Sequence, residues 1–215
     1  MVQTELKMTT IDVRPFTSVF SGLVENGESP EYFYLTGYEG ICVKTDRLQV
    51  CKSVISSVVP IDSELLLIGD NDACESWRDL CACLDINVTL LDGDAVELTD
   101  IESVLKANLR ISHVMCTGRR GRRDLEEIGR LAHRMHRSFV VEVEENEVLR
   151  LRDVEELSID FLISSPKDDR DVSLIVAKRA KLVQTEGNAR SSQYDIYAMW
   201  QQEVGMRSST LLPMY

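Results

Sequence analysis

A run of four arginines is the most concentrated set of side chains in the sequence that could bind a ligand. Arg119, Arg120, Arg122 and Arg123 flank Gly121, between a predicted strand and a predicted helix. Ligands of open α/β sheets bind at such junctions, and guanidinium groups bind phosphate and carboxylate groups through paired hydrogen bonds. The run predicts either a site for a small phosphate or phosphonate ligand, or a solvated loop or subunit contact paired with acidic residues.

The cysteines and histidines do not have the spacing of a metal site. Cys74, Cys81 and Cys83 are not followed by the second ligand pair that a zinc site needs, and the first two share an apolar helical face. His133 and His136 are three residues apart near the end of a predicted helix, where the helix dipole favours positive charge. We therefore expect no metal.

The composition excludes several classes of protein. The 215 residues are 44% hydrophobic and 28% charged, enough for one domain with a buried core. The 24 Lys and Arg against 36 Asp and Glu give a net charge of −12, which disfavours nucleic-acid and membrane-surface partners. No apolar run is long enough for a bilayer, and no secretory signal is apparent. Because the six cysteines lie mostly in apolar patterns, we expect free thiols and a cytoplasmic protein.

Apolar runs alternate with amphipathic stretches from about residue 45 onward. Strands that are apolar throughout and separated by helices predict a parallel sheet covered on both faces. The last two strands are too close in sequence for a helical crossover and are expected to be antiparallel. The predicted strands are 64–68, 86–91, 112–116, 139–143, 160–163 and 173–177, and the predicted helices are 46–59, 73–84, 99–109, 124–137, 153–157 and 194–204. The sequence thus predicts a three-layer, doubly wound α/β domain with a mainly parallel sheet.

Three segments are expected along the chain. Residues 45–205 form the α/β domain, and residues 206–215 form a loose tail. Residues 1–44 scatter aromatic side chains among Gly and Pro, which indicates an irregular arm or lid.

Four short stretches resemble the large domain of class V, fold-type I aminotransferases, which use pyridoxal phosphate. They are VISSVVP (54–60), EEIGRLA (126–132), IDFLISS (159–165) and EGNARS (186–191), the last followed by Asp195-Ile196-Tyr197 and Trp200. Their order and spacing are most similar to the 2-aminoethylphosphonate:pyruvate transaminase branch. The resemblance implies the same doubly wound sheet and covers about two thirds of the chain.

In that family, activity requires a lysine that forms a Schiff base with the cofactor. The resemblance places this lysine two residues beyond the Ser164-Ser165 pair, and Asp168 holds that position. Lys167 lies one residue early, and a one-residue shift on an extended segment points a side chain to the opposite face. Lys167 would therefore need a register slip to take the role.

The resemblance also assigns positions that hold the cofactor. Glu142 stands where the family has an Asp facing the pyridine nitrogen, and Ser165 is expected near the phosphate. The phosphate turn, at a helix N-terminus in the family, falls on residues 45–48, which contain Asp46 and no glycine. The family's C-terminal small domain is expected to be missing.

These departures predict an aminotransferase-like pseudoenzyme that needs no cofactor. It would act through binding, as a homodimer or as the partner of an active aminotransferase relative. Two alternatives remain open. One is a pyridoxal-phosphate-dependent transaminase of the 2-aminoethylphosphonate type that uses Lys167, Glu142 and Ser165; the other is a phosphate or phosphonate sensor that uses Arg119–Arg123.

Overall fold

An eight-stranded mixed sheet forms the centre of the computed structural model, which describes residues 12–14, 37–92, 96–117, 121–144, 151–165 and 173–210. The strands lie side by side in the order β1-β2-β8-β7-β6-β5-β3-β4. Their bounds are β1 Asp12–Arg14, β2 Tyr38–Lys44, β3 Glu64–Gly69, β4 Asn87–Asp92, β5 Ile111–Cys116, β6 Ser138–Glu144, β7 Phe161–Ser165 and β8 Ser173–Lys178.

The strand directions confirm the predicted sheet. The strands β4, β3, β5, β6 and β7 are parallel, whereas β8 is antiparallel to both β7 and β2. From the adjacent strands β3 and β5, the chain continues to opposite sides of the sheet. The carboxyl ends of these two strands therefore form a topological switch point, the place where open α/β sheets bind ligands.

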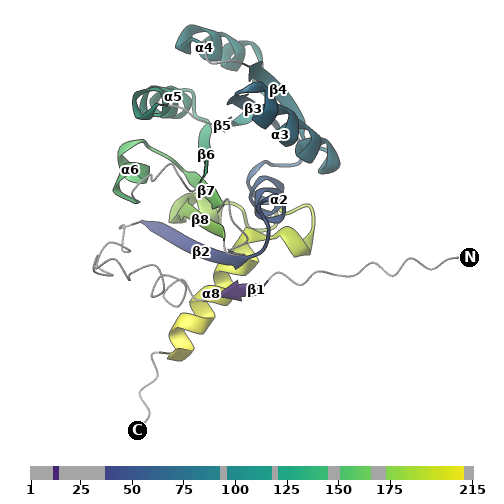
Figure 1. Ribbon diagram of the computed structural model, residues 1–215, viewed down its shortest axis with the longest axis vertical. Coiled ribbons are helices and arrows are strands. Elements are labelled where there is room, and N and C mark those ends of the chain that lie inside the picture. Colours follow the sequence, from purple (N-terminus) through teal and green to yellow (C-terminus); the bar gives the residue numbers. More distant parts are fainter. Residues whose placement is uncertain are drawn as a thin grey trace, which may run out of the picture.

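Helices cover both faces of the sheet, which confirms the three-layer α/β fold. Figure 1 shows α4, α5 and α6 on one side of the sheet and α2 and α3 on the other. The helix bounds are α2 Arg47–Val58, α3 Asn71–Cys83, α4 Leu98–Ala107, α5 Arg122–Arg134, α6 Leu151–Glu156, α7 Arg179–Val183 and α8 Ile196–Thr210, with a 3₁₀ turn at Ser192–Tyr194. Among the described residues, no helix is both long and apolar enough to cross a membrane.

The two faces of β3 explain why it reads as one continuous apolar run. Leu65 and Leu67 pack with α2 and α3 in one hydrophobic cluster, while Leu66 and Ile68 pack with α4 and α5 in the other. All four side chains are fully buried. Because successive side chains of a strand point to opposite faces, a strand covered on both faces must be apolar at every position.

Two of the stretches that carry the family resemblance have structural roles. The guanidinium of Arg190 donates to the carbonyl oxygens of Val59 and Pro60, at 2.7 and 3.4 Å, and so caps the end of α2. Gly129 lets α5 approach closely, since a Cβ there would lie 2.5 Å from the carbonyl oxygen of Leu157. These motifs therefore stabilise helix packing.

The predicted boundaries at both ends of the domain need correction. Residues 1–44 were expected to form an irregular arm, which is wrong for Tyr38–Lys44, because this segment is β2 and pairs with β8 along its length. Residues 206–210, assigned to a tail, continue α8. Asp12–Arg14 adds a short edge strand next to β2. The other residues of the expected arm and tail lie outside the described ranges.

Candidate functional site

Glu142 is a buried carboxylate at the carboxyl end of β6, with its side chain 4% exposed. Val140, two residues earlier on the same face of the strand, packs in the hydrophobic cluster under α2 and α3. A carboxylate in such surroundings needs hydrogen-bond donors and a compensating charge, because removal from water penalises its ionised form.

Four donor atoms from three residues satisfy the two oxygens of this carboxylate. Arg47 donates from Nε at 2.7 Å, and its Nη2 lies 2.6 Å from the same Oε1. Trp77 donates from its indole nitrogen at 2.6 Å, and Thr117 from its hydroxyl at 2.7 Å, both to Oε2. A carboxylate offers about four lone-pair sites. We call Glu142, Arg47, Trp77 and Thr117 the Glu142 cluster; its four short contacts match the number of lone-pair sites on the carboxylate.

Ends of secondary structure elements bring the cluster together. Arg47 is the first residue of α2, which begins there because the side chain of Asp46 accepts a 2.9 Å hydrogen bond from the backbone N–H of Gln49. Thr117 directly follows β5, and its own N–H donates to the carbonyl oxygen of Ile68 at 3.0 Å. Trp77 lies on the buried face of α3. The carboxyl edge of the sheet thus gathers groups from α2, α3, β5 and β6.

The electrostatics of the cluster favour a structural thiol over a reactive one. Cys51 donates from its Sγ to Oε1 of Glu142 across 3.6 Å. Burial raises the pKa of Cys51 well above its ordinary value, and the charge of Glu142 raises it further, while Arg47 opposes the shift. The thiolate is the nucleophilic form of cysteine, so a protonated Cys51 is a poor nucleophile.

The residues present do not fit pyridoxal phosphate in the way the family resemblance implies. Its ring nitrogen would need an acceptor on Glu142, whose oxygens are already bonded to Arg47, Trp77 and Thr117. Its phosphate would need the free N–H groups at the start of α2, where the carboxylate of Asp46 is the cap. Both anchor points are satisfied by the chain itself.

The remaining residues assigned to the cofactor are not placed at this cluster. Lys167 and Asp168 lie outside the described residues, so their relation to the Glu142 cluster stays a prediction. Ser165 is the last residue of β7, and its side chain is not among those described. The role of Lys167 as the Schiff-base lysine is therefore open.

The described arginines of the basic run are engaged by carboxylates of the same chain. Arg122 forms an ion pair with Asp153 at 2.6 Å and a second one with Glu156, both on α6. Arg123 pairs with Glu127 one turn along α5, at 3.1 Å. Neither arginine joins the Glu142 cluster. Arg119 and Arg120 lie outside the described residues, and the anion site stays a prediction.

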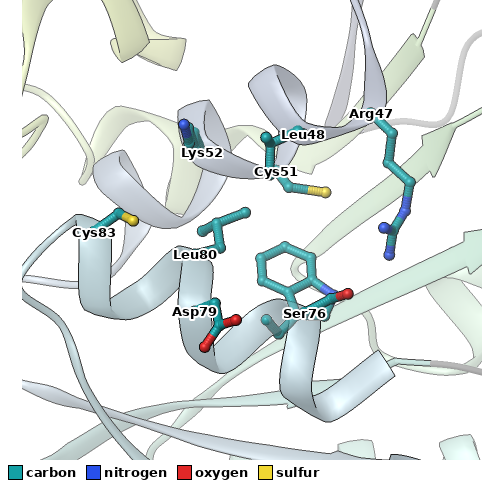
Figure 2. Close-up of a pocket in the computed structure, with 9 residues that line it drawn as sticks. Arg47, Leu48, Cys51, Lys52, Ser76, Asp79, Leu80 and Cys83 are labelled. Atoms are coloured by element: carbon teal, nitrogen blue, oxygen red, sulfur yellow. The ribbon is translucent and has the colours of Figure 1, made fainter. Parts of the chain in front are cut away.

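A groove of about 310 Å³ runs between α2 and α3 next to the cluster. Its lining includes Arg47, Leu48, Cys51, Trp77, Leu80 and Cys83. Figure 2 shows Arg47 hanging from α2 at one end of the groove and Cys83 at the opposite end. Arg47 and Trp77 therefore belong both to the Glu142 cluster and to the lining of the groove, where Arg47 is half-exposed and Trp77 is buried.

Reasoning from the sequence missed two of the cluster residues. Trp77 lies in the predicted helix 73–84 and is buried, but no pattern in the sequence predicts its hydrogen bond to Glu142. Thr117 was not singled out. Its position directly after the predicted strand 112–116 was the available signal, because side chains that follow adjacent parallel strands meet at one edge.

The chain is similar in sequence to aminoethylphosphonate transaminases. No family model matches it. It is 30% identical over 160 residues to the bifunctional phosphonoacetaldehyde hydrolase/aminoethylphosphonate transaminase of Clostridioides difficile, a match that covers 69% of this chain and 25% of that protein. It is 28% identical over 190 residues to the 2-aminoethylphosphonate–pyruvate transaminase of Aeromonas hydrophila, covering 83% of this chain and 50% of that protein.

Solved structures show the same fold. The alanine–glyoxylate aminotransferase of Nostoc sp. matches with a TM-score of 0.64 at 13% identity, over 82% of this chain and 50% of that one. The chain thus spans a quarter of the bifunctional relative and about half of the other two proteins. By sequence and fold, the chain is a relative of the class V, pyridoxal-phosphate-dependent aminotransferases and carries their large-domain fold.

Proposed function

We propose that this chain is a non-catalytic member of the aminotransferase fold that acts through binding. Its partner is a second copy of itself or an aminotransferase relative, and it does not hold pyridoxal phosphate in the manner of those enzymes. The observation that carries this proposal is the saturation of Glu142 by Arg47, Trp77 and Thr117.

Two further features support the proposal. The carboxylate of Asp46 caps the start of α2 by accepting from the N–H of Gln49, so a phosphate there would meet a negative charge. The position that the family resemblance reserves for the lysine is Asp168. Such a chain has no contact for the ring nitrogen, no phosphate turn and no lysine at the family position. It therefore keeps the aminotransferase fold without the Schiff-base chemistry.

The runner-up is a transaminase of the 2-aminoethylphosphonate type that uses Lys167. The names of the relatives support it, since both sequence relatives are described as transaminases. It requires pyridoxal phosphate to displace the donors from Glu142 and to reach a lysine one residue from the family position.

One experiment separates the two candidates. The protein and its Lys167→Ala variant are mixed with pyridoxal phosphate, and visible spectra are recorded before and after borohydride. We expect the same weak, distributed lysine labelling in both proteins by peptide mass spectrometry. A single adduct at Lys167 that disappears in the variant would establish the runner-up.

The pairing is tested separately by sedimentation velocity over a hundredfold range of protein concentration. We expect a dimer at micromolar concentration, or a mixed complex when an active transaminase relative is added. A monomer under both conditions would refute the binding role.

A further inference from the structure

Trp77 and Arg47 each present a planar group with N–H donors to Glu142. The family resemblance assigns a group of this kind, the ring nitrogen of the cofactor, to the same carboxylate. The indole of Trp77 is an aromatic ring with one N–H, directed at Oε2 from 2.6 Å. The guanidinium of Arg47 is a planar cation with two nitrogens within 2.7 Å of Oε1. Charge-assisted pairs of this geometry are among the strongest hydrogen bonds in proteins.

We propose that the Glu142 carboxylate is a self-occupied binding site for a planar nitrogen cation, and that the guanidinium of Arg47 is its built-in ligand. This inference rests on the proposed function, because it explains what replaced the cofactor at that position. The ligand class that fits the site is a guanidinium or amidinium, with two N–H groups for Oε1.

The burial and charge of the pair fit a carboxylate that requires a cation. Glu142 is 4% exposed at its side chain, while that of Arg47 is 47% exposed. The carboxylate is thus fixed inside the domain, and the cation approaches from the solvent side. A buried carboxylate left without its cation is strongly destabilising, so the site favours any planar cation that can reach it.

The groove between α2 and α3 lies next to the pair, and the side chain of Arg47 stands between the groove and Glu142. Arg47 and Trp77 line the groove, and its volume of about 310 Å³ exceeds that of a small amidinium. In the native protein the tether keeps the Arg47 guanidinium at an effective concentration of millimolar or more, so a dissolved cation competes poorly. Removal of the Arg47 head group leaves the carboxylate open to the groove.

The test is chemical rescue of Arg47→Ala by methylguanidinium, with Arg78→Ala as the matched control. Arg78 lies on the neighbouring helix α3 and is 3.8 Å from the exposed Glu75. Thermal unfolding is followed with 10 mM methylguanidinium or 10 mM sodium chloride. We expect Tm to fall by roughly 5 °C or more in Arg47→Ala and by less than about 2 °C in Arg78→Ala.

Methylguanidinium is expected to raise the Tm of Arg47→Ala by about 2 °C and to leave the native protein, Arg78→Ala and Arg47→Ala/Glu142→Gln unchanged. An equal response in all four proteins, or none in Arg47→Ala, would overturn the inference. If Arg47→Ala does not fold, the inference is tested by recording the arginine Nε–H signals of the native protein by NMR. A slowly exchanging arginine Nε–H signal that is missing in Arg47→Lys supports the inference, and its absence from the native spectrum refutes it.

The two proposals fail separately. A Lys167 adduct with pyridoxal phosphate, together with an intact methylguanidinium response, would overturn the proposed function and leave a cation site at Glu142. No adduct and no response would leave the proposed function standing and remove this inference.

Discussion

The contact of α5 with β6 makes a quantitative test of the fold possible through one substitution, Gly129→Ala. A Cβ at this position would lie 2.5 Å from the carbonyl oxygen of Leu157 and 2.9 Å from Cδ1 of the buried Phe139. Side chains can rotate away from a new methyl group, but a backbone oxygen moves only if its segment moves. The substitution therefore forces α5 away from the turn between α6 and β7.

Two opposing terms set the size of the stability change in Gly129→Ala. Alanine is a better helix former than glycine by about 1 kcal/mol, whereas an added methyl group in a packed interior costs about 1–3 kcal/mol and occasionally more. Because the nearest atom belongs to the backbone, we expect the steric term to win, with a net loss of about 1–2 kcal/mol. For a chain of this size that corresponds to a fall in Tm of about 2–8 °C.

Gly205→Ala is the matched control. Gly205 is also in a helix, α8, but among the described residues no atom beyond its chain neighbours and the helix's own backbone lies within 4 Å of the Cβ position. Only the helix-propensity term of about 1 kcal/mol acts there, so Tm is expected to rise by about 2–4 °C. If the packing is as described, calorimetry shows a fall in Tm for Gly129→Ala and a rise for Gly205→Ala. A rise in Tm for both would show that α5 does not contact the Leu157 backbone.

Three further predictions concern the end of α2, a buried histidine and the cysteines. Arg190→Lys keeps the charge but loses the fork that caps α2, and it is expected to lower the free energy of unfolding in urea by about 1.5–3 kcal/mol; a change below about 0.5 kcal/mol would contradict this role. Burial lowers the pKa of His113 to about 4, so the unfolded chain binds more protons than the folded one below about pH 6.5. The stability from this histidine is therefore complete above pH 6.5 and is lost towards pH 4, by up to about 1.4 kcal/mol per pH unit. His113→Gln should flatten that slope in urea titrations, and an unchanged slope in this variant would contradict the assignment. Of the five free cysteines that the structure describes, only Cys83 is exposed, and burial raises the pKa of Cys81 to about 12. Maleimide should label Cys83 first in the native protein, and earlier labelling of Cys81 by mass spectrometry would contradict this.

The layered sheet could be predicted because strands buried on both faces have a strong signal. Leu65–Ile68 is apolar at every position, and the short link between β7 and β8 required an antiparallel pair. β2 was missed for a physical reason. It contains Gly40 and buries only alternate apolar residues such as Ile41 and Val43, and its neighbour β8 comes more than 100 residues later. A local sequence pattern cannot predict a partner strand as distant as β8.

The candidate site could be predicted only in part. Glu142 was identified through the family resemblance, and the structure finds it buried at the expected edge of the sheet. Asp46 and Arg47 were read as a damaged phosphate turn, whereas they form a helix cap and an ion pair. Which donor reaches Glu142 depends on the rotation of α2 and α3 against the sheet. That rotation follows from packing of whole helices, which short motifs do not encode.

The position of β2 also has a consequence for the newly made chain. Tyr38–Lys44 is synthesised more than 100 residues before its partner strand, Ser173–Lys178. At translation rates of about 5–20 residues per second, that interval lasts several seconds, during which the edge of β2 that pairs with β8 has no strand to join. Nascent chains stalled before residue 173 should consequently be the species that chaperones hold and that aggregate when chaperones are depleted.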